Sequence, residues 1–95
     1  MPESKVIWDI GGRGGSATFE DHRTAFYFPW EIGADGWELE IASAENWERQ
    51  TGLPLAERAE TLRLFGEAGL KRFGADRYGW KIMEGKYCSM LIFEK

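Results

Sequence analysis

Residues 24–41, TAFYFPWEIGADGWELEI, decide the fold class of this chain. On both sides of the glycine-bounded turn at 33–36, apolar side chains alternate with other residues, most clearly in WELEI at 37–41. A period of two residues predicts strands, and apolar residues alternating with charged ones are typical of an antiparallel sheet with one wet face. The opposite face of this sheet therefore needs a covering layer.

The same period predicts further strands at 5–10, 16–22, 77–83 and 86–94. The first two are expected to pair as a hairpin, and the last two are expected to pair across a two-residue turn at Glu84–Gly85. The last strand is apolar on both faces, which places it in the middle of the sheet or at a dimer interface. Its apolar neighbours also predict that Cys88 is a buried, unreactive thiol.

One face of the strand at 24–32 is expected to point into the core. Its members occupy alternate positions: Thr24, Phe26, Phe28, Trp30 and Ile32. Pro29 lies on the opposite face and has no N–H to donate to a ladder, so this strand is expected at an edge of the sheet or with a bulge.

Two helices are expected between the two groups of strands. Ser43 suits the N-cap of a short helix over AENWERQ, which Gly52 would end and which would turn Trp47 toward the core. Pro54 suits the first position of a longer helix of about 18 residues, which Gly74 would end.

An apolar stripe marks the core face of the longer helix, at Leu55, Ala59, Leu62, Gly66, Gly69 and Phe73. Glycine inside a helix costs roughly 1 kcal/mol relative to alanine, so Gly66 and Gly69 need a structural reason. They indicate that the helix closely approaches the sheet or a partner helix.

The order β-β-β-β-α-α-β-β predicts an α+β fold: a mostly antiparallel sheet of five to six strands with one short and one longer helix packed on one face. The 95 residues fit a single small globular domain spanning 1–95. No apolar run is long enough for a membrane span, there is no secretion signal, and the lone Cys88 cannot form an internal disulfide. A soluble, bacterial-type, cytoplasmic domain without a membrane partner is therefore expected.

The glycine run IGGRGGSA at 10–17 matches the dinucleotide fingerprint G-x-G-x-x-A at Gly12, Gly14 and Ala17. That fingerprint also requires a helix directly after the glycines, whereas SATFEDHRT favours a strand. No cofactor is expected, but a glycine-rich turn with Arg13 at its tip could still hold a phosphate or carboxylate.

Catalytic and metal-binding patterns are weak. His22, beside Glu20 and Asp21, is the one candidate general base, and no nucleophile elbow accompanies it. One histidine and one cysteine cannot complete a tetrahedral zinc site. No catalytic residue or metal ligand is assigned, and the interpretation leans away from an enzyme.

Aromatic and acidic residues are the features left for function. Fourteen aromatic side chains, from five Trp, six Phe and three Tyr, exceed what so small a core easily encloses. Trp30, Trp37 and Trp80 are therefore expected to line a pocket or to meet a second subunit. The segment Glu31–Glu48 contains six acidic residues and no basic ones, namely Glu31, Asp35, Glu38, Glu40, Glu45 and Glu48. Such a segment repels nucleic acid and can attract a basic protein.

The sequence thus predicts a non-catalytic protein-interaction or regulatory module that acts as a homodimer and binds a basic protein through Glu31–Glu48. The alternative is a small-molecule binding protein. It would use an aromatic pocket at Trp30, Trp37 and Trp80 and an anion-holding loop at Gly12, Arg13 and Gly14.

Overall fold

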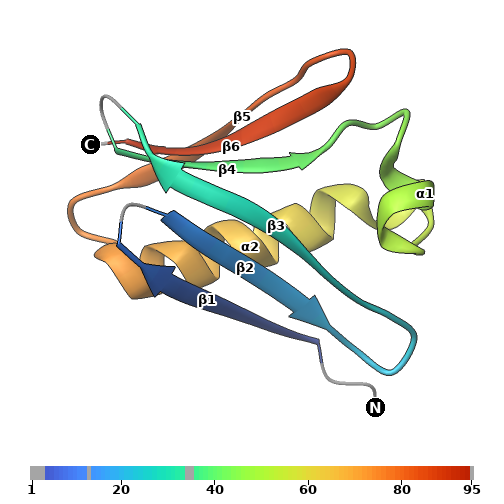
Figure 1. Ribbon diagram of the computed structural model, residues 1–95, viewed down its shortest axis with the longest axis horizontal. Helices are drawn as coiled ribbons and strands as arrows, with labels where there is room; N and C mark the ends of the chain where they lie inside the picture. The colour runs from blue at the N-terminus through green and yellow to red at the C-terminus, as the bar shows by residue number, and fades with distance from the viewer. Residues whose placement is uncertain (1–3, 13, 34–35, 95) are drawn as a thin grey trace.

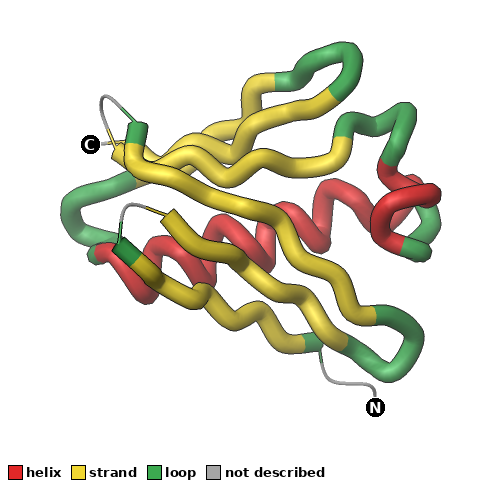
Figure 2. The backbone as a smooth tube through the Cα atoms, viewed as in Figure 1, coloured by secondary structure: helices red, strands yellow, loops and turns green. Residues whose placement is uncertain are grey.

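A six-stranded sheet with helices on one face forms the molecule (Figures 1 and 2). The computed structural model describes residues 4–12, 14–33 and 36–94. Its elements are β1 (Lys5–Gly11), β2 (Gly14–Glu20), β3 (Ala25–Ile32), β4 (Gly36–Ala42), α1 (Trp47–Thr51), the 3₁₀ turn η1 (Leu55–Glu57), α2 (Arg58–Phe73), β5 (Gly79–Met83) and β6 (Cys88–Glu94). The strand order is β1-β2-β3-β4-β6-β5, and all neighbours are antiparallel. The predicted α+β architecture is confirmed, with β6 in the interior of the sheet.

The core lies between the sheet and α2 and is largely aromatic. One group of rings surrounds Phe65 and consists of Phe19, Phe26, Phe28 and Trp47. The other surrounds Phe73 near the end of α2 and consists of Trp8, Trp30, Trp37 and Phe93. Most of the aromatic surplus is thus accommodated by ring-on-ring packing under the sheet, where each ring pair adds about 0.5–1.5 kcal/mol to the effect of burial.

The two helix glycines are explained by the close approach of α2 to the sheet. A Cβ atom at Gly66 would lie 2.4 Å from Cε2 of Trp80, and one at Gly69 would lie 2.3 Å from Cζ of Phe93. Real Cβ atoms do not approach other atoms so closely. The two rings therefore occupy the space that any larger residue would need, as the sequence predicted.

The first turns of the helical region differ from the prediction. The longer helix begins with η1, and Leu55 remains 48% exposed. Arg58, instead of the exposed Ala59, occupies the buried face of the first turn of α2. The short helix begins at Trp47 with Asn46 as its N-cap, and the Ser43 hydroxyl instead accepts a hydrogen bond from the Asn46 N–H at 3.3 Å.

Three strand predictions are also wrong in detail. Ile32, the last residue of β3, is 50% exposed and is not part of the core. The β5–β6 connection spans 84–87 and is longer than the two residues predicted, since Met83 pairs with Met90 and Glu84 is bound by Arg58 instead of forming a tight turn. Cys88 is exposed because its side of the sheet carries no helix.

Candidate functional site

The strands β3 and β4 are paired over only part of their length. Their register includes three pairs, Trp30–Leu39, Glu31–Glu38 and Ile32–Trp37. Beyond Trp30 the strands separate, and α1 lies at the open end of the wedge (Figure 1). The sheet is therefore interrupted between two of its interior strands, β3 and β4, and not only bounded at its edges.

Pro29 explains where this ladder stops. The Gly33 N–H donates to the Gly36 carbonyl at 2.7 Å, and hydrogen-bonded pairs in an antiparallel ladder recur at every second residue. The next such pairs are Glu31 with Glu38 and then Pro29 with Glu40. Proline has no N–H, so the second pair cannot form both of its hydrogen bonds. Of the two predicted alternatives for this strand, an edge position or a bulge, the edge position is wrong because β3 is an interior strand; its first half nevertheless lacks a partner on the β4 side.

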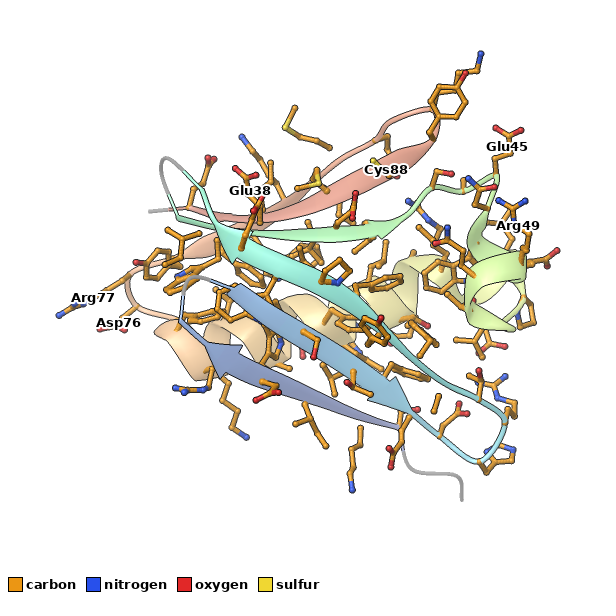
Figure 3. The ribbon with its side chains drawn as sticks, viewed as in Figure 1. Glu38, Glu45, Arg49, Asp76, Arg77 and Cys88 are labelled. Atoms are coloured by element: carbon orange, nitrogen blue, oxygen red, sulfur yellow. The ribbon has the colours of Figure 1, made fainter. Side chains whose placement is uncertain are left out.

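The separation leaves a groove on the face of the sheet that has no helix. It consists of two adjoining hollows of about 210 and 390 Å³ that share Pro29 and Glu40. The remaining lining residues are Trp30, Glu31, Glu38 and Met90 in the first hollow, and Tyr27, Phe28, Ile41, Gln50 and Cys88 in the second. We call these two adjoining hollows together the Pro29 groove; Figure 3 views this face, with Glu38 and Cys88 labelled.

Two side chains close the opening from the helix side. Trp47 is fully buried against Phe28, and its indole N–H donates to the Pro54 carbonyl at 3.2 Å. Arg58 donates from Nη2 to the carbonyl of Ala42 at 3.1 Å. By the same alternation, an uninterrupted ladder would pair Ala42 with Tyr27 of β3. Arg58 therefore supplies the donor that the missing strand pairing would have provided.

Arg58 is itself held by charged and polar partners. Its Nη1 and Nη2 donate to the Glu84 carboxylate, each at 2.8 Å, and the Ser89 hydroxyl donates to the same carboxylate at 2.7 Å. These hydrogen bonds, from Arg58 first and Ser89 second, lower the pKa of Glu84 below its ordinary value. This network could not be predicted from the sequence, because no local pattern connects an arginine of a helix with the carbonyl of a strand end.

Uncompensated negative charge is concentrated at the narrow end of the Pro29 groove. Glu31 and Glu38 are directly opposite one another on β3 and β4, and Glu40 follows on the same face of β4. Like charges directly opposite one another destabilise a sheet by roughly 0.2–1 kcal/mol. Among the described residues, none of these three glutamates has an ion-pair partner, whereas five other glutamates do: Glu57, Glu60, Glu67, Glu84 and Glu94.

The acidic segment predicted as a binding surface is divided by the fold. Glu31, Glu38 and Glu40 line the groove. Glu45 is exposed just before α1 and points away from the groove (Figure 3), and the Glu48 carboxylate accepts the Leu55 N–H at 3.0 Å. Asp35 lies outside the described residues. Three of the six predicted acids therefore form one surface.

The three tryptophans predicted to form a pocket occupy different positions. Trp30 and Trp37 lie together with ring centres 5.1 Å apart, and Trp37 stacks on Phe73 at 4.3 Å. Trp30 is buried, and its indole N–H donates to the Asp9 carbonyl at 3.1 Å. Trp80 covers Gly66 instead. Of the three, Trp30 also contributes to the lining of the Pro29 groove.

The glycine run forms the tight β1–β2 hairpin. Gly12 has a φ of 63°, a left-handed conformation that glycine adopts readily, and Gly14 pairs with Gly11 as the first residue of β2. Gly15 is small for a reason of its own, because a Cβ there would lie 2.0 Å from the Asp9 carbonyl oxygen that Trp30 binds. Arg13, the predicted anion-binding residue, lies outside the described residues. A strand follows the glycines where the dinucleotide fingerprint requires a helix.

The remaining candidates do not converge on one another. His22 is exposed in the β2–β3 turn, where the neighbouring Asp21 carboxylate accepts hydrogen bonds from Arg23. Over the described parts of the chain, no group of three or more His, Cys, Asp or Glu residues is arranged to hold a metal ion. Cys88, at the wide end of the groove, is the one thiol of the chain.

Comparison with protein-family models, with curated proteins and with solved structures gives no match. Within 4–12, 14–33 and 36–94, no helix has the length and apolar character needed to cross a membrane.

Proposed function

We propose that this chain is a non-catalytic protein-interaction module that acts as a homodimer and binds a basic segment of a partner protein in the Pro29 groove. The observation that supports it best is the position of Glu31, Glu38 and Glu40. Three carboxylates that have no ion-pair partner among the described residues line a groove that also has an apolar surface, at Pro29 and Met90.

Lysine and arginine side chains match this combination. Their aliphatic stems pack on apolar surface while the charged head group stays at a polar rim. Here the aliphatic stem would lie along Pro29 and Met90. The head group would lie between Glu31 and Glu38, which are directly opposite one another on the adjacent strands β3 and β4. Charge-assisted hydrogen bonds to carboxylates are about twice as strong as neutral ones, so binding would relieve a repulsion and replace it with attraction.

An extended segment suits the wide end of the groove. Tyr27 lies two residues before Pro29, so its backbone N–H and C=O point to the same side, toward the space that β4 has left. Its side chain is 66% exposed beside this space. Strands that present unpaired backbone groups bind extended peptides by main-chain hydrogen bonds. A basic segment in extended conformation could therefore use the backbone of β3 as well as the glutamates.

A titration with defined peptides tests this proposal. The probe is a short peptide that alternates lysine with valine, and its counterpart has glutamate in place of lysine. The lysine peptide should shift the backbone amide NMR signals of β3 and β4, and this binding should weaken with salt. The glutamate peptide should not bind. Equal binding of both peptides would contradict the proposal.

Substitutions locate the peptide site within the sheet. The double variant Glu38→Gln/Glu40→Gln should weaken binding of the lysine peptide about tenfold or more, since hydrogen bonds to charged groups contribute roughly 1.5–3 kcal/mol each. The matched control is Glu20→Gln, which removes an exposed carboxylate from β2. It lies on the same open face at a distance from the groove and should leave the affinity unchanged.

Small-molecule binding is the second candidate, and the indole groups near Phe73 favour it. Among the described residues, the buried Nε1 atoms of Trp8 and Trp37 have no hydrogen-bond partner. Leaving a buried donor unpaired costs roughly 1–3 kcal/mol, which a ligand with acceptor atoms would recover. Thermal-shift screening with nucleotides and acidic metabolites tests this candidate, because a ligand at 100 times its Kd stabilises by about 2.7 kcal/mol. This candidate would be excluded if no compound raised Tm and if the Arg13→Ala variant gave the same result as the wild type.

A further inference from the structure

The outer strand β1 has a free backbone edge. It is the first strand of the sheet, and in the part of the chain that the structure describes it pairs with β2 alone (Figure 1). The Asp21 N–H donates to the Thr24 carbonyl at 3.0 Å, which sets the alternation of hydrogen-bonded pairs through β2 and β3. Carried across β2, the same alternation turns the backbone groups of Val6 and Trp8 outward, away from β2. These donors and acceptors are available to another strand.

The side chains of β1 are complementary to themselves in the antiparallel direction. Lys5 and Asp9 lie two residues before and after Ile7, on the face of the sheet without helices. Ile7 is 50% exposed between them. Among the described residues, Lys5 and Asp9 have no ion-pair partner. A second copy of β1, turned by a two-fold rotation about Ile7, would place each charge opposite its counterpart.

We propose that two copies of this chain pair through β1 in an antiparallel arrangement centred on Ile7. Val6 then exchanges backbone hydrogen bonds with the partner's Trp8, as the outward orientation of both residues allows. Lys5 faces the partner's Asp9, and the two Ile7 side chains meet at the two-fold axis as a non-hydrogen-bonded pair. This proposal deepens the homodimer part of the proposed function by specifying the interface.

The charges select this register over its neighbours. A pairing centred on Val6 would place Lys5 opposite the partner's Ile7. One centred on Trp8 would place Ile7 opposite the partner's Asp9. Of these three pairings, only the one centred on Ile7 places Lys5 opposite the partner's Asp9 and also brings the two Ile7 side chains together. Cross-strand pairs of opposite charge and of apolar side chains stabilise a sheet. The interface is isologous, so each favourable contact occurs twice.

The opposite edge of the sheet does not have this property. β5 has five residues with Lys81 at its centre, and an antiparallel pairing about that residue would place Lys81 opposite itself. Like charges directly opposite are destabilising. Lys81 is moreover already paired with Glu94 at 3.0 Å. Charged residues of this kind are a common protection of edge strands against association.

A second layer of contact lies beneath β1. Two adjoining hollows of about 350 and 340 Å³ lie where β1 meets α2, and both are lined by Val6, Ala68 and Lys71. Their lining is mainly apolar around Val6, Trp8 and Ala68. Pairing of two β1 strands brings the partner's β1 and α2 beside these two hollows, so their apolar lining is covered together with the strand edge.

A charge exchange tests the interface. Light scattering during size-exclusion chromatography should show a dimer of the 10.9-kDa chain. Lys5→Asp and Asp9→Lys, made separately, should each weaken dimerisation about tenfold or more, because each replaces two attractions with two repulsions. The combined variant Lys5→Asp/Asp9→Lys restores opposite charges in the same register and should restore the dimer. A monomeric wild type, or single variants that dimerise normally, would overturn the proposal. So would a folded double variant that stays monomeric.

A cysteine placed on the two-fold axis tests the register independently. Cα atoms of a non-hydrogen-bonded antiparallel pair lie about 4.5 Å apart, within the range that a disulfide spans. Ile7→Cys in a Cys88→Ser background should therefore form a disulfide-linked dimer on mild oxidation. The control is Tyr27→Cys in the same background, which places an exposed thiol on the open face away from the edge. Equal cross-linking of both variants would overturn the register. These variants leave Glu31, Glu38 and Glu40 intact, so a failed dimer and a failed peptide site can be told apart.

Discussion

Replacement of Gly69 by alanine should destabilise the protein, although alanine is the better helix former. The helix propensity alone would favour the variant by about 1 kcal/mol. The added Cβ would lie 2.3 Å from Cζ of Phe93, a ring that is fully buried and packed against Trp8 with centroids 5.4 Å apart. To restore an ordinary contact the ring must move by about 1 Å in a filled core, and such overpacking costs roughly 1–3 kcal/mol. Because Phe93 has no free side, we expect the upper end of this range and a net loss of about 2 kcal/mol.

Thermal unfolding followed by circular dichroism measures this difference. For a domain of this size, a loss of about 2 kcal/mol lowers Tm by roughly 8–16 °C. Gly66→Ala should have a smaller effect, because its contact is Trp80, a half-buried ring on the edge strand β5. Ala59→Gly, at an exposed position of α2, is the propensity control and should cost about 1 kcal/mol. A Gly69→Ala variant that melts at or above the wild-type temperature would refute the close-packing argument.

Three other outcomes can be measured directly. The pKa of Glu84 is lowered by hydrogen bonds from Arg58 and Ser89, so their stabilisation is present above the ordinary value of 4.5 and is lost as pH falls through the lowered value. The urea midpoint of the wild type should therefore fall more steeply below pH 4.5 than that of Glu84→Gln; parallel curves would contradict this. Pro29→Val restores an N–H to the ladder, so hydrogen exchange should show a protected amide at this position, with weaker binding of the lysine peptide; an unprotected amide would contradict the ladder argument. Cys88 is exposed and should react completely with a thiol reagent in the folded protein, whereas reaction limited by unfolding would contradict its placement.

Short-range patterns were sufficient to predict most of the architecture. The alternation in WELEI marked β4, with Leu39 and Ile41 buried beneath the sheet. Gly66 and Gly69 indicate a close approach of the helix, and the contacting rings are those of Trp80 and Phe93. These predictions are confirmed because each depends only on neighbouring residues within one strand or helix. Within such an element, the backbone period determines the direction of each side chain.

The incorrect predictions depend on contacts between distant parts of the chain. The apolar residues on both faces of β6 could not indicate which side the single helical layer covers, so Cys88 was placed inside. The predicted apolar stripe of the longer helix includes Ala59 and not Arg58, yet Arg58 is buried and donates to the carbonyl of Ala42, which lies 16 residues earlier in the chain. The acidic residues were found by composition, but only the register of Glu31 with Glu38 shows which of them share a surface.

The proposed dimer and the proposed peptide site have a joint geometric consequence. A two-fold axis through paired β1 strands lies perpendicular to the sheet, so both Pro29 grooves open on the same face. Each groove lies three strand spacings from the axis, which puts the two grooves about 29 Å apart at about 4.8 Å per strand. A partner with two basic segments at that separation would gain from the high effective concentration of the second site, whereas one with a single segment would not. A monomeric Lys5→Asp variant should therefore bind a single lysine peptide as the wild type does and lose its advantage only for two peptides joined by a linker of matching reach. Loss of single-peptide binding in that variant would instead connect the β1 edge with the integrity of the groove itself.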